Sequence, residues 1–194
     1  MGFLSVLSMA HKWIAERTQP GDTVIDATAG GGVDTLALAE LVGPKGCVYA
    51  FDIQEDALHR TRQRLAPLIE AGRLPRLHLK LADHADMADY VDEEAAGCAA
   101  AVMFNLGYLP GGDPAVITRT ESTLRALESA LDLLRPGGIL TCVLYPGHPG
   151  GEAEAAAVEA WAAKLPQSAG QAVLYRQPQR QAAPYLIAVE RRKS

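Results

Sequence analysis

Hydrophobic and polar residues alternate along the 194-residue chain in two recurring patterns. Short, continuously apolar runs are typical of buried strands, and longer stretches with apolar residues every three or four positions are typical of helices. The runs predict strands over residues 23–27, 47–52, 76–82, 99–104, 139–144, 171–176 and 184–190. The longer stretches predict helices over residues 3–17, 33–42, 55–70, 116–134 and 152–165, with a short helix in the polar loop 83–97. Pro67 is expected to disturb the last turn of the third helix, because proline has no backbone N–H.

This order of elements predicts an α/β fold. Five strands that alternate with helices indicate a doubly wound, mostly parallel sheet with helices on both faces. A hairpin-like pair of strands then closes the chain. The pattern contains no internal repeat, low-complexity tail or linker, and the length suits one domain, so residues 1–194 are expected to form a single domain.

Composition narrows the class of protein. The formal net charge of −5 gives no global attraction to nucleic acid, so an RNA substrate would need a local basic patch. Cys47, Cys98 and Cys142 lie in apolar segments without C-x-x-C spacing, and we expect them to be reduced core residues of an intracellular protein. The first ten residues lack the basic region of a signal peptide, which favours an amphipathic helix and a cytoplasmic location.

The most informative motif is D-A-T-A-G-G-G, residues 26–32, directly after the first predicted strand. Gly30, Gly31 and Gly32 allow a sharp turn and a close approach of the backbone to a ligand, because glycine has no Cβ. The next predicted strand ends in Asp52. A carboxylate at this strand end can accept both hydroxyl protons of a ribose, as in the nucleotide-type cofactor sites of doubly wound sheets. A glycine-rich turn that binds no ligand is the alternative.

The glycine spacing favours S-adenosylmethionine (SAM) over a dinucleotide. Dinucleotide sites carry G-x-G-x-x-G, with a helix N-terminus aimed at the pyrophosphate. The present motif overlays better on the acid-x-G-x-G-x-G turn of SAM methyltransferases, with Thr28 in place of the first glycine. Asp26 and Asp34 suit the positive sulfonium and amino groups of SAM and would repel a pyrophosphate. A nicotinamide-dependent oxidoreductase is therefore the disfavoured alternative.

Asn105 follows the fourth predicted strand, at the start of the loop N-L-G-Y-L-P-G-G. Ligands of such sheets bind beyond the carboxyl ends of the strands, so Asn105 is expected beside the cofactor on the substrate side. Its amide oxygen can accept an N–H and hold a nitrogen nucleophile in line with the methyl–sulfonium bond. Tyr108 can then pack against the substrate base. The alternative is an asparagine in a turn, with Tyr108 filling the core.

Two further segments are expected at the same edge of the sheet. Tyr145 and His148 follow the fifth strand and can touch a substrate there, and His148 can act as a base near neutral pH. A lone surface histidine that is only solvated is the competing interpretation. Asp83 and His84 end the third strand, where SAM enzymes bind the edge of adenine.

Five segments together resemble the rRNA methylase family, whose characterised members are tRNA methyltransferases of the MnmM type. They are DATAGGGVDTLALAEL, VYAFDIQ, MFNLGYLPGGD, VLYPGHPGG and PYLIAVE, and the third and fourth are far more specific than the glycine turn. The resemblance covers almost the whole chain. It implies a class I SAM-methyltransferase (Rossmann-like) fold, with a mostly parallel seven-stranded sheet that contains one antiparallel strand. It also implies SAM-dependent methylation of the aminomethyl group of 5-aminomethyl-2-thiouridine at the tRNA wobble position.

The resemblance assigns Gly30, Asp34, Asp52, Gln54 and His84 to the SAM site and residues 105–108 to the active-site loop. Family members often carry Asn at positions 31 and 33 and Asp-Ser-His at 82–84, where this chain departs from them. The cofactor-binding residues expected from all these arguments are Asp26, Gly30, Gly31, Gly32, Asp34, Asp52, Gln54, Asp83 and His84. The expected catalytic residues are Asn105, Tyr108 and His148.

Other substrates and partners are compatible with the same motifs. The alternatives are a methyltransferase of rRNA or of a small molecule, since a fold does not determine its substrate, and a SAM- or RNA-binding module without catalysis. Contact with tRNA is expected at one of two basic groups, Arg60, Arg62, Arg64, Arg73 and Arg76 or Arg176, Arg180, Arg191, Arg192 and Lys193. A homodimer is left open. No metal is expected, because the five histidines lack the ligand spacing of a zinc site.

Overall fold

The computed structural model describes residues 2–107, 119–147, 149–180 and 182–192. The strands are β1 (Thr23–Asp26), β2 (Cys47–Asp52), β3 (Arg76–Leu81), β4 (Ala99–Asn105), β5 (Leu134–Leu144), β6 (Gly170–Tyr175) and β7 (Tyr185–Arg191). The α-helices are α1 (Val6–Ala15), α2 (Val33–Val42), α3 (Glu55–Arg64), α4 (Ala66–Glu70), α5 (Thr120–Leu133) and α6 (Gly151–Lys164). Two short 3-10 helices, η1 (His84–Asp89) and η2 (Glu93–Ala95), join β3 to β4.

The strands form one seven-stranded sheet in the order β3-β2-β1-β4-β5-β7-β6. β1 pairs in parallel with β2 and β4, and the parallel pairing continues to β3 on one side and β5 on the other. β7 runs antiparallel to both β5 and β6. The predicted doubly wound sheet with one antiparallel strand is therefore confirmed.

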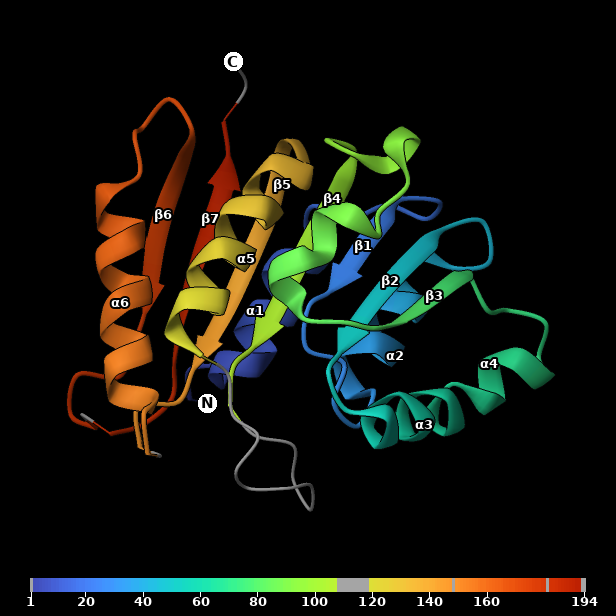
Figure 1. Cartoon of the computed structure of the whole chain (residues 1–194), viewed down its shortest axis with the longest axis horizontal. Helices are drawn as coiled ribbons and strands as arrows, with labels where there is room; N and C mark the ends of the chain where they lie inside the picture. Colours follow the sequence, from blue (N-terminus) through green and yellow to red (C-terminus); the bar gives the residue numbers. More distant parts are fainter. Residues whose placement is uncertain (1, 108–118, 148, 181, 193–194) are drawn as a thin grey trace.

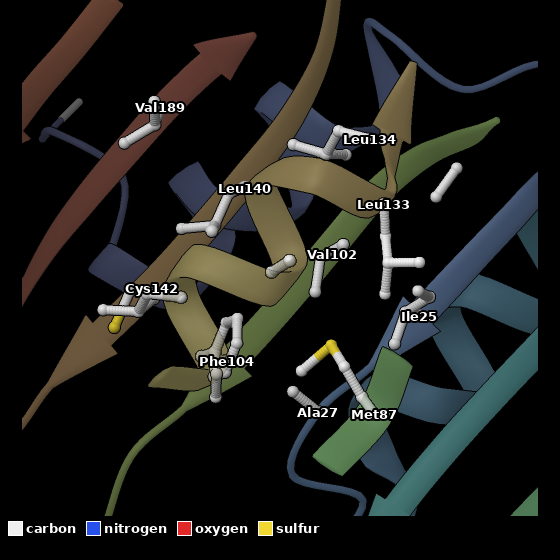
Figure 2. Packing of buried hydrophobic residues seen from close by; sticks show 14 of the residues in the cluster. Ile25, Ala27, Met87, Val102, Phe104, Leu133, Leu134, Leu140, Cys142 and Val189 are labelled. Carbon is white, nitrogen blue, oxygen red and sulfur yellow. The ribbon is translucent and has the colours of Figure 1, made fainter. Parts of the chain in front are cut away.

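Helices cover both faces of this sheet. In Figure 1, α5 and α6 lie in front of it and α1 and α2 behind it. Strand side chains alternate between the two faces, and each face has its own buried cluster. On the α5 side, Phe104 of β4, Cys142 of β5 and Met87 of η1 belong to one buried cluster, and Figure 2 shows Phe104 between the other two. On the other side, Met103 of β4 belongs to the cluster that contains Ile14 of α1.

Two predicted boundaries are wrong because of proline and glycine. The helix predicted over residues 55–70 is broken at Leu65 into α3 and α4. Pro67 lies in the first turn of α4, where its missing N–H removes no helical hydrogen bond, so it helps to begin a helix. β5 begins at Leu134 and not at residue 139, directly after α5. Its register with β4 shifts between Ala99 and Ala101, and Gly137 adopts a φ of +79° in this irregular part.

Two more expectations differ from the structure. The helix predicted over residues 116–134 is α5, which begins at Thr120, because Arg119 is extended, with a φ of −108° and a ψ of 133°. Residues 116–118 lie outside the described residues. Cys47 and Cys142 are buried as expected, but Cys98 is exposed, since it lies in the turn before β4 and not in the strand.

Candidate active site

The carboxyl ends of the parallel strands open onto one cleft. It has a volume of about 1610 Å³ and is lined by residues that directly follow four of these strands. Among the lining residues are Thr28 after β1, Asp52 at the end of β2, Asp83 after β3 and Asn105 at the end of β4. Parallel strands bring these positions together because their carboxyl ends lie at the same edge of the sheet.

The Asp52 carboxylate holds the glycine turn in place. Its Oδ2 accepts a hydrogen bond from the backbone N–H of Gly30 at 2.9 Å, and Oδ1 accepts one from the N–H of Gln54, also at 2.9 Å. The turn is held from the other side by α3, where Thr61 donates to the Gly30 carbonyl and Arg64 to the Gly31 carbonyl. Each carboxylate oxygen retains a second lone pair, so Asp52 can still accept hydroxyl protons from a ligand in the cleft.

Gly30 and Gly32 of this turn both have a positive φ, and Gly32 also lies tightly against α3. Its φ is +77°, and a Cβ there would lie 2.7 Å from the Cα of Thr61. We expect Gly32→Ala to lower the free energy of unfolding by about 2 kcal/mol, because strain and the contact with α3 add together. Urea unfolding measures the loss. Gly31→Ala is the matched control, since a Cβ at Gly31 meets no atom within 4 Å, and equal stability of the two variants would refute the expectation.

Asp26 is wholly buried at the end of β1. Its Oδ2 accepts a 2.6 Å hydrogen bond from the Thr35 hydroxyl, and Oδ1 accepts one from the N–H of Thr28 at 3.1 Å. Burial, together with the nearby Asp34 carboxylate, raises the pKa of Asp26 to about 7 despite these two hydrogen bonds. Asp26 is therefore an internal anchor of the turn, and it is absent from the described residues that line the cleft.

Asp34 lies in the first turn of α2 and is nearly buried. Its Oδ1 lies 2.7 Å from Nε2 of His11 in α1, and its Oδ2 accepts a 3.1 Å hydrogen bond from Nδ2 of Asn105. The bond with Asp34 raises the pKa of His11 from its ordinary value, although partial burial of the ring acts in the opposite direction. Asp34 thus connects α1, which sequence reasoning left outside the site, with the end of β4.

Asn105 is held at both its main chain and its side chain. Its N–H donates to the Thr28 hydroxyl at 2.8 Å, which ties β4 to the turn after β1. Its side chain also hydrogen-bonds with Tyr145, which follows β5. Burial raises the pKa of the Tyr145 hydroxyl, and the charge of Asp34 acts in the same direction. The hydroxyl therefore stays protonated near neutral pH and is available as a donor in the cleft.

Asp83 and His84 lie on the cleft wall at the end of β3, as predicted. The Asp83 carboxylate accepts from the N–H of Ala85 and so caps η1. The ring of His84 is nearly buried, stands edge-on to Phe104 and hydrogen-bonds with the backbone of Ala27. Burial lowers its pKa, and its Nε2 has no hydrogen-bond partner among the described residues. This buried nitrogen lies 3.8 Å from Oδ1 of Asp83.

Most of the predicted site residues lie together. Lining the cleft are Gly30, Gly31, Asp34, Asp52, Gln54, Asp83, His84 and Asn105, whereas Gly32 and Asp26 shape the turn behind it. Tyr108 and His148 lie outside the described residues, so their roles stay predictions. Sequence reasoning missed His11, Thr28 and Thr35 as parts of the site. Thr28 and Thr35 flank the glycine motif, and this position in the sequence could have identified them. No sequence pattern identifies His11, because its contact with Asp34 depends on where α1 packs.

The two basic groups differ in their relation to the cleft. Arg60 and Arg64 of the first group line it, and so does Arg119, which neither group contained. In the second group, Arg191 donates to the carbonyls of Asp132 and Leu134 at the junction of α5 and β5. Arg176 lies 5.0 Å from the centre of the Tyr185 ring. The positive rim of the cleft therefore comes from α3 and the start of α5.

The described residues contain no group of three or more His, Cys, Asp or Glu side chains arranged to hold a metal ion. Within the same part of the chain, no helix is both long and apolar enough to cross a lipid bilayer.

Comparison with known proteins identifies the family to which the chain belongs. Residues 48–190 match the model of the family described as “Putative rRNA methylase”. The chloroplastic tRNA (mnm5s2U34)-methyltransferase of Arabidopsis thaliana is 40% identical over 191 residues, which are 96% of this chain and 69% of that protein. A “putative rRNA-methylase” from Clostridium thermocellum is 36% identical and superposes with a TM-score of 0.91, over 98% of this chain and 100% of that one.

A “putative methyltransferase” from Streptococcus mutans was crystallised with S-adenosylhomocysteine. It is 32% identical, with a TM-score of 0.84 over 98% of this chain and 99% of that one. The sheet order is thus shared with solved relatives over nearly the whole chain. From its sequence match and its fold, the chain belongs to the rRNA methylase family of class I SAM-dependent methyltransferases.

Proposed function

We propose that this protein transfers a methyl group from SAM to the aminomethyl nitrogen of 5-aminomethyl-2-thiouridine at the wobble position of tRNA. One observation carries the proposal: the Asn105 amide lies at the substrate side of a cleft whose other wall is the glycine turn and Asp52. The 40% identity to the Arabidopsis tRNA methyltransferase supports this substrate over others of the same fold. The protein is an enzyme, and SAM is its expected methyl donor.

The chemistry of the cleft fits SAM. Asp52 retains lone pairs for the hydroxyls of a ribose, and Asp83 and His84 line the cleft where the edge of adenine is expected. The Asp34 carboxylate adds negative charge near the glycine turn, which suits a sulfonium and an ammonium group. SAM supplies an electrophilic methyl group when it is bound. The residues that we assign to its binding are Gly30, Gly31, Asp34, Asp52, Gln54, Asp83 and His84, and Asp26 and Gly32, also expected there from the sequence, support the glycine turn from behind the cleft.

The chain contributes mainly alignment to the reaction. The aminomethyl group would first give up a proton, because a protonated amine has no lone pair. Its nitrogen would then take the methyl group of bound SAM as the carbon–sulfur bond breaks, with S-adenosylhomocysteine as the leaving group. Nδ2 of Asn105 donates a hydrogen bond to Asp34. The oxygen Oδ1 is therefore the end of the amide that can accept an N–H of the amine. This contact would hold the nitrogen lone pair towards the methyl group. We assign catalytic roles to Asn105, Tyr108 and His148, with His148 or Tyr108 as candidates for the proton acceptor.

The decisive experiment offers the purified protein several substrates with SAM. They are tRNA bearing 5-aminomethyl-2-thiouridine, the same tRNA with unmodified uridine, rRNA and a free alkyl amine. Mass spectrometry of the digested nucleosides should show one added methyl group on the first substrate only. Methylation of rRNA or of the free amine would show that the protein acts on that substrate instead. SAM binding without any methyl transfer would indicate a binding module without catalysis. A thermal shift with S-adenosylhomocysteine but not with NADH would establish the cofactor class.

The RNA is expected to approach over the arginine rim. Arg60→Glu together with Arg119→Glu should raise the KM for tRNA about tenfold and leave SAM affinity unchanged, because both residues line the cleft and phosphates need cations. The salt dependence of tRNA binding should also become shallower by about one unit of slope for each lost contact. The matched control is Arg176→Glu with Arg192→Glu, away from the cleft. If the control variant has the larger effect, the second basic group carries the RNA.

Three further expectations concern the domain organisation, the cellular location and the oligomeric state of the protein. We propose that residues 1–194 act as one methyltransferase domain, supported by the single sheet to which β1 to β7 all belong. A cytoplasmic location and a homodimer are retained as predictions. Cell fractionation and light scattering of the purified protein test them.

A further inference from the structure

His11 is linked by hydrogen bonds through Asp34 to Asn105, which lines the cleft. Its Nε2 lies 2.7 Å from Oδ1 of Asp34, and the other oxygen of that carboxylate accepts from Nδ2 of Asn105 at 3.1 Å. The three residues come from α1, α2 and β4, and 71 positions separate Asp34 from Asn105. A continuous path of hydrogen bonds thus joins α1 to the proposed catalytic amide.

The Asp34 contact determines which end of the Asn105 amide faces the cleft. A carboxylate can only accept hydrogen bonds, whereas an amide has a donating nitrogen and an accepting oxygen. Rotating the amide by half a turn would place Oδ1 of Asn105 against an Asp34 oxygen with no proton between them. Asp34 therefore selects the rotamer in which Oδ1 points away from the carboxylate and keeps a lone pair for an amine N–H beside the contact with Tyr145.

The Asp34 carboxylate itself needs a second anchor. The Asp34 charge is one of the causes that raise the pKa of the buried Asp26, and Asp26 has both oxygens occupied by Thr28 and Thr35. His11 supplies the missing donor for Oδ1, and a protonated imidazole also offsets the acidic pair. Asp34 and Asp26 are the charged groups that raise the pKa of His11, and partial burial opposes them.

We propose that His11 is a positioning residue of the methyl-transfer site, whose imidazole fixes the Asp34 carboxylate so that Asp34 fixes the Asn105 amide. His11 is not among the described residues that line the cleft, so it acts through Asp34 and does not touch substrate. The inference rests on the proposed function in one respect, since it takes Asn105 as the residue that aligns the amine.

Two substitutions separate the hydrogen bond from simple packing. His11→Leu removes the donor and keeps an apolar side chain on α1, whereas the amide of His11→Gln can place an N–H where the imidazole Nε2 lies. We expect His11→Leu to lower the single-turnover rate about tenfold with a change in SAM affinity below about threefold. His11→Gln should recover most of the rate. The control is His59→Leu, because His59 is an exposed histidine of α3 that lies 3.9 Å from an exposed Glu55.

Nuclear magnetic resonance of the RNA-free protein tests the same path without the reaction. The side-chain amide signals of Asn105 should shift in His11→Leu, return in His11→Gln and stay in place in His59→Leu. In Asp34→Asn, the pKa of His11 should fall towards its ordinary value. A wild-type protein that methylates no tRNA can still show Asn105 amide signals that change with the residue at position 11. In that case the positioning role of His11 stands and the proposed substrate is wrong.

The proposal is overturned if His11→Leu folds and leaves both the rate and the Asn105 signals unchanged. It is equally overturned if SAM affinity and rate fall together while the Asn105 signals stay in place, because that pattern indicates a packing role. If His11→Leu does not fold, His11→Asn replaces it, since its amide is too short to reach Asp34 from the same backbone position.

Discussion

Replacing Asn105 by alanine is expected to lower the rate of methyl transfer at least about 100-fold, with SAM affinity nearly unchanged. The main-chain bond from Asn105 to Thr28 survives this substitution, so the end of β4 should keep its place. The variant loses the amide that accepts the amine N–H, together with the hydrogen bonds of that amide to Asp34 and Tyr145. Because alignment is realised in the transition state, the loss should appear in turnover and not in binding. The measurement is single-turnover transfer to tRNA bearing the aminomethyl group, with saturating SAM.

Asn105→Asp is the informative companion variant. Its carboxylate can also accept an N–H, so part of the activity should remain. It would lie against the Asp34 oxygen that now accepts from Asn105 at 3.1 Å, and two carboxylates at such a distance share a proton. Its rate should therefore depend on pH more steeply than that of the wild type. A folded, SAM-binding Asn105→Ala protein with a near wild-type rate would instead direct attention to Tyr145.

Asp52→Ala should weaken SAM binding by about 1.5–3 kcal/mol, the scale of charge-assisted hydrogen bonds. Two losses combine in this variant. The ribose loses its acceptor, and the N–H groups of Gly30 and Gln54 lose the oxygens that hold the turn in shape. Calorimetric titration with SAM measures the affinity, and a thermal melt establishes that the protein is folded.

Asp56→Ala is a suitable control for the charge change, because Asp56 is an exposed residue of α3 that pairs with Arg60. Its SAM affinity should stay within about twofold of the wild type. Unchanged SAM binding in a folded Asp52→Ala protein would remove Asp52 from the cofactor site and leave it a purely structural role in the turn.

Much of the architecture follows from local sequence patterns. β2 and β4 are almost wholly buried, and strands covered on both faces are continuously apolar, which makes them recognisable without a structure. The residues that end such strands must meet at one edge of a parallel sheet. The meeting of Asp52 and Asn105 in one cleft was therefore predictable from their positions alone. The glycine turn was recognisable because a positive φ at Gly32 favours glycine.

Other features depended on competition between local signals. Pro67 follows an apolar stretch, and such a proline can either disturb the last turn of one helix or begin a new one. The structure shows a new helix, α4, with Leu65 and Leu68 packed in the core.

The R-P-G-G segment predicts a turn, and it forms the irregular part of β5 between Leu134, which aligns with Ala99, and Ile139, which aligns with Ala101. The turn propensity of these residues is kept within the strand as a local irregularity, with Gly137 at a positive φ.

The sequence by itself determined the order of the elements, the sheet edge that carries the cleft, and the chemistry of Asp52 and Asn105. Only the tertiary structure showed that Arg191 holds backbone carbonyls while Arg119 lines the cleft, and that His11 meets Asp34. Periodicity reports how a segment folds against its own neighbours in the chain. A hydrogen bond between α1 and α2, or between α2 and β4, depends on how whole elements pack, and no local pattern encodes that packing.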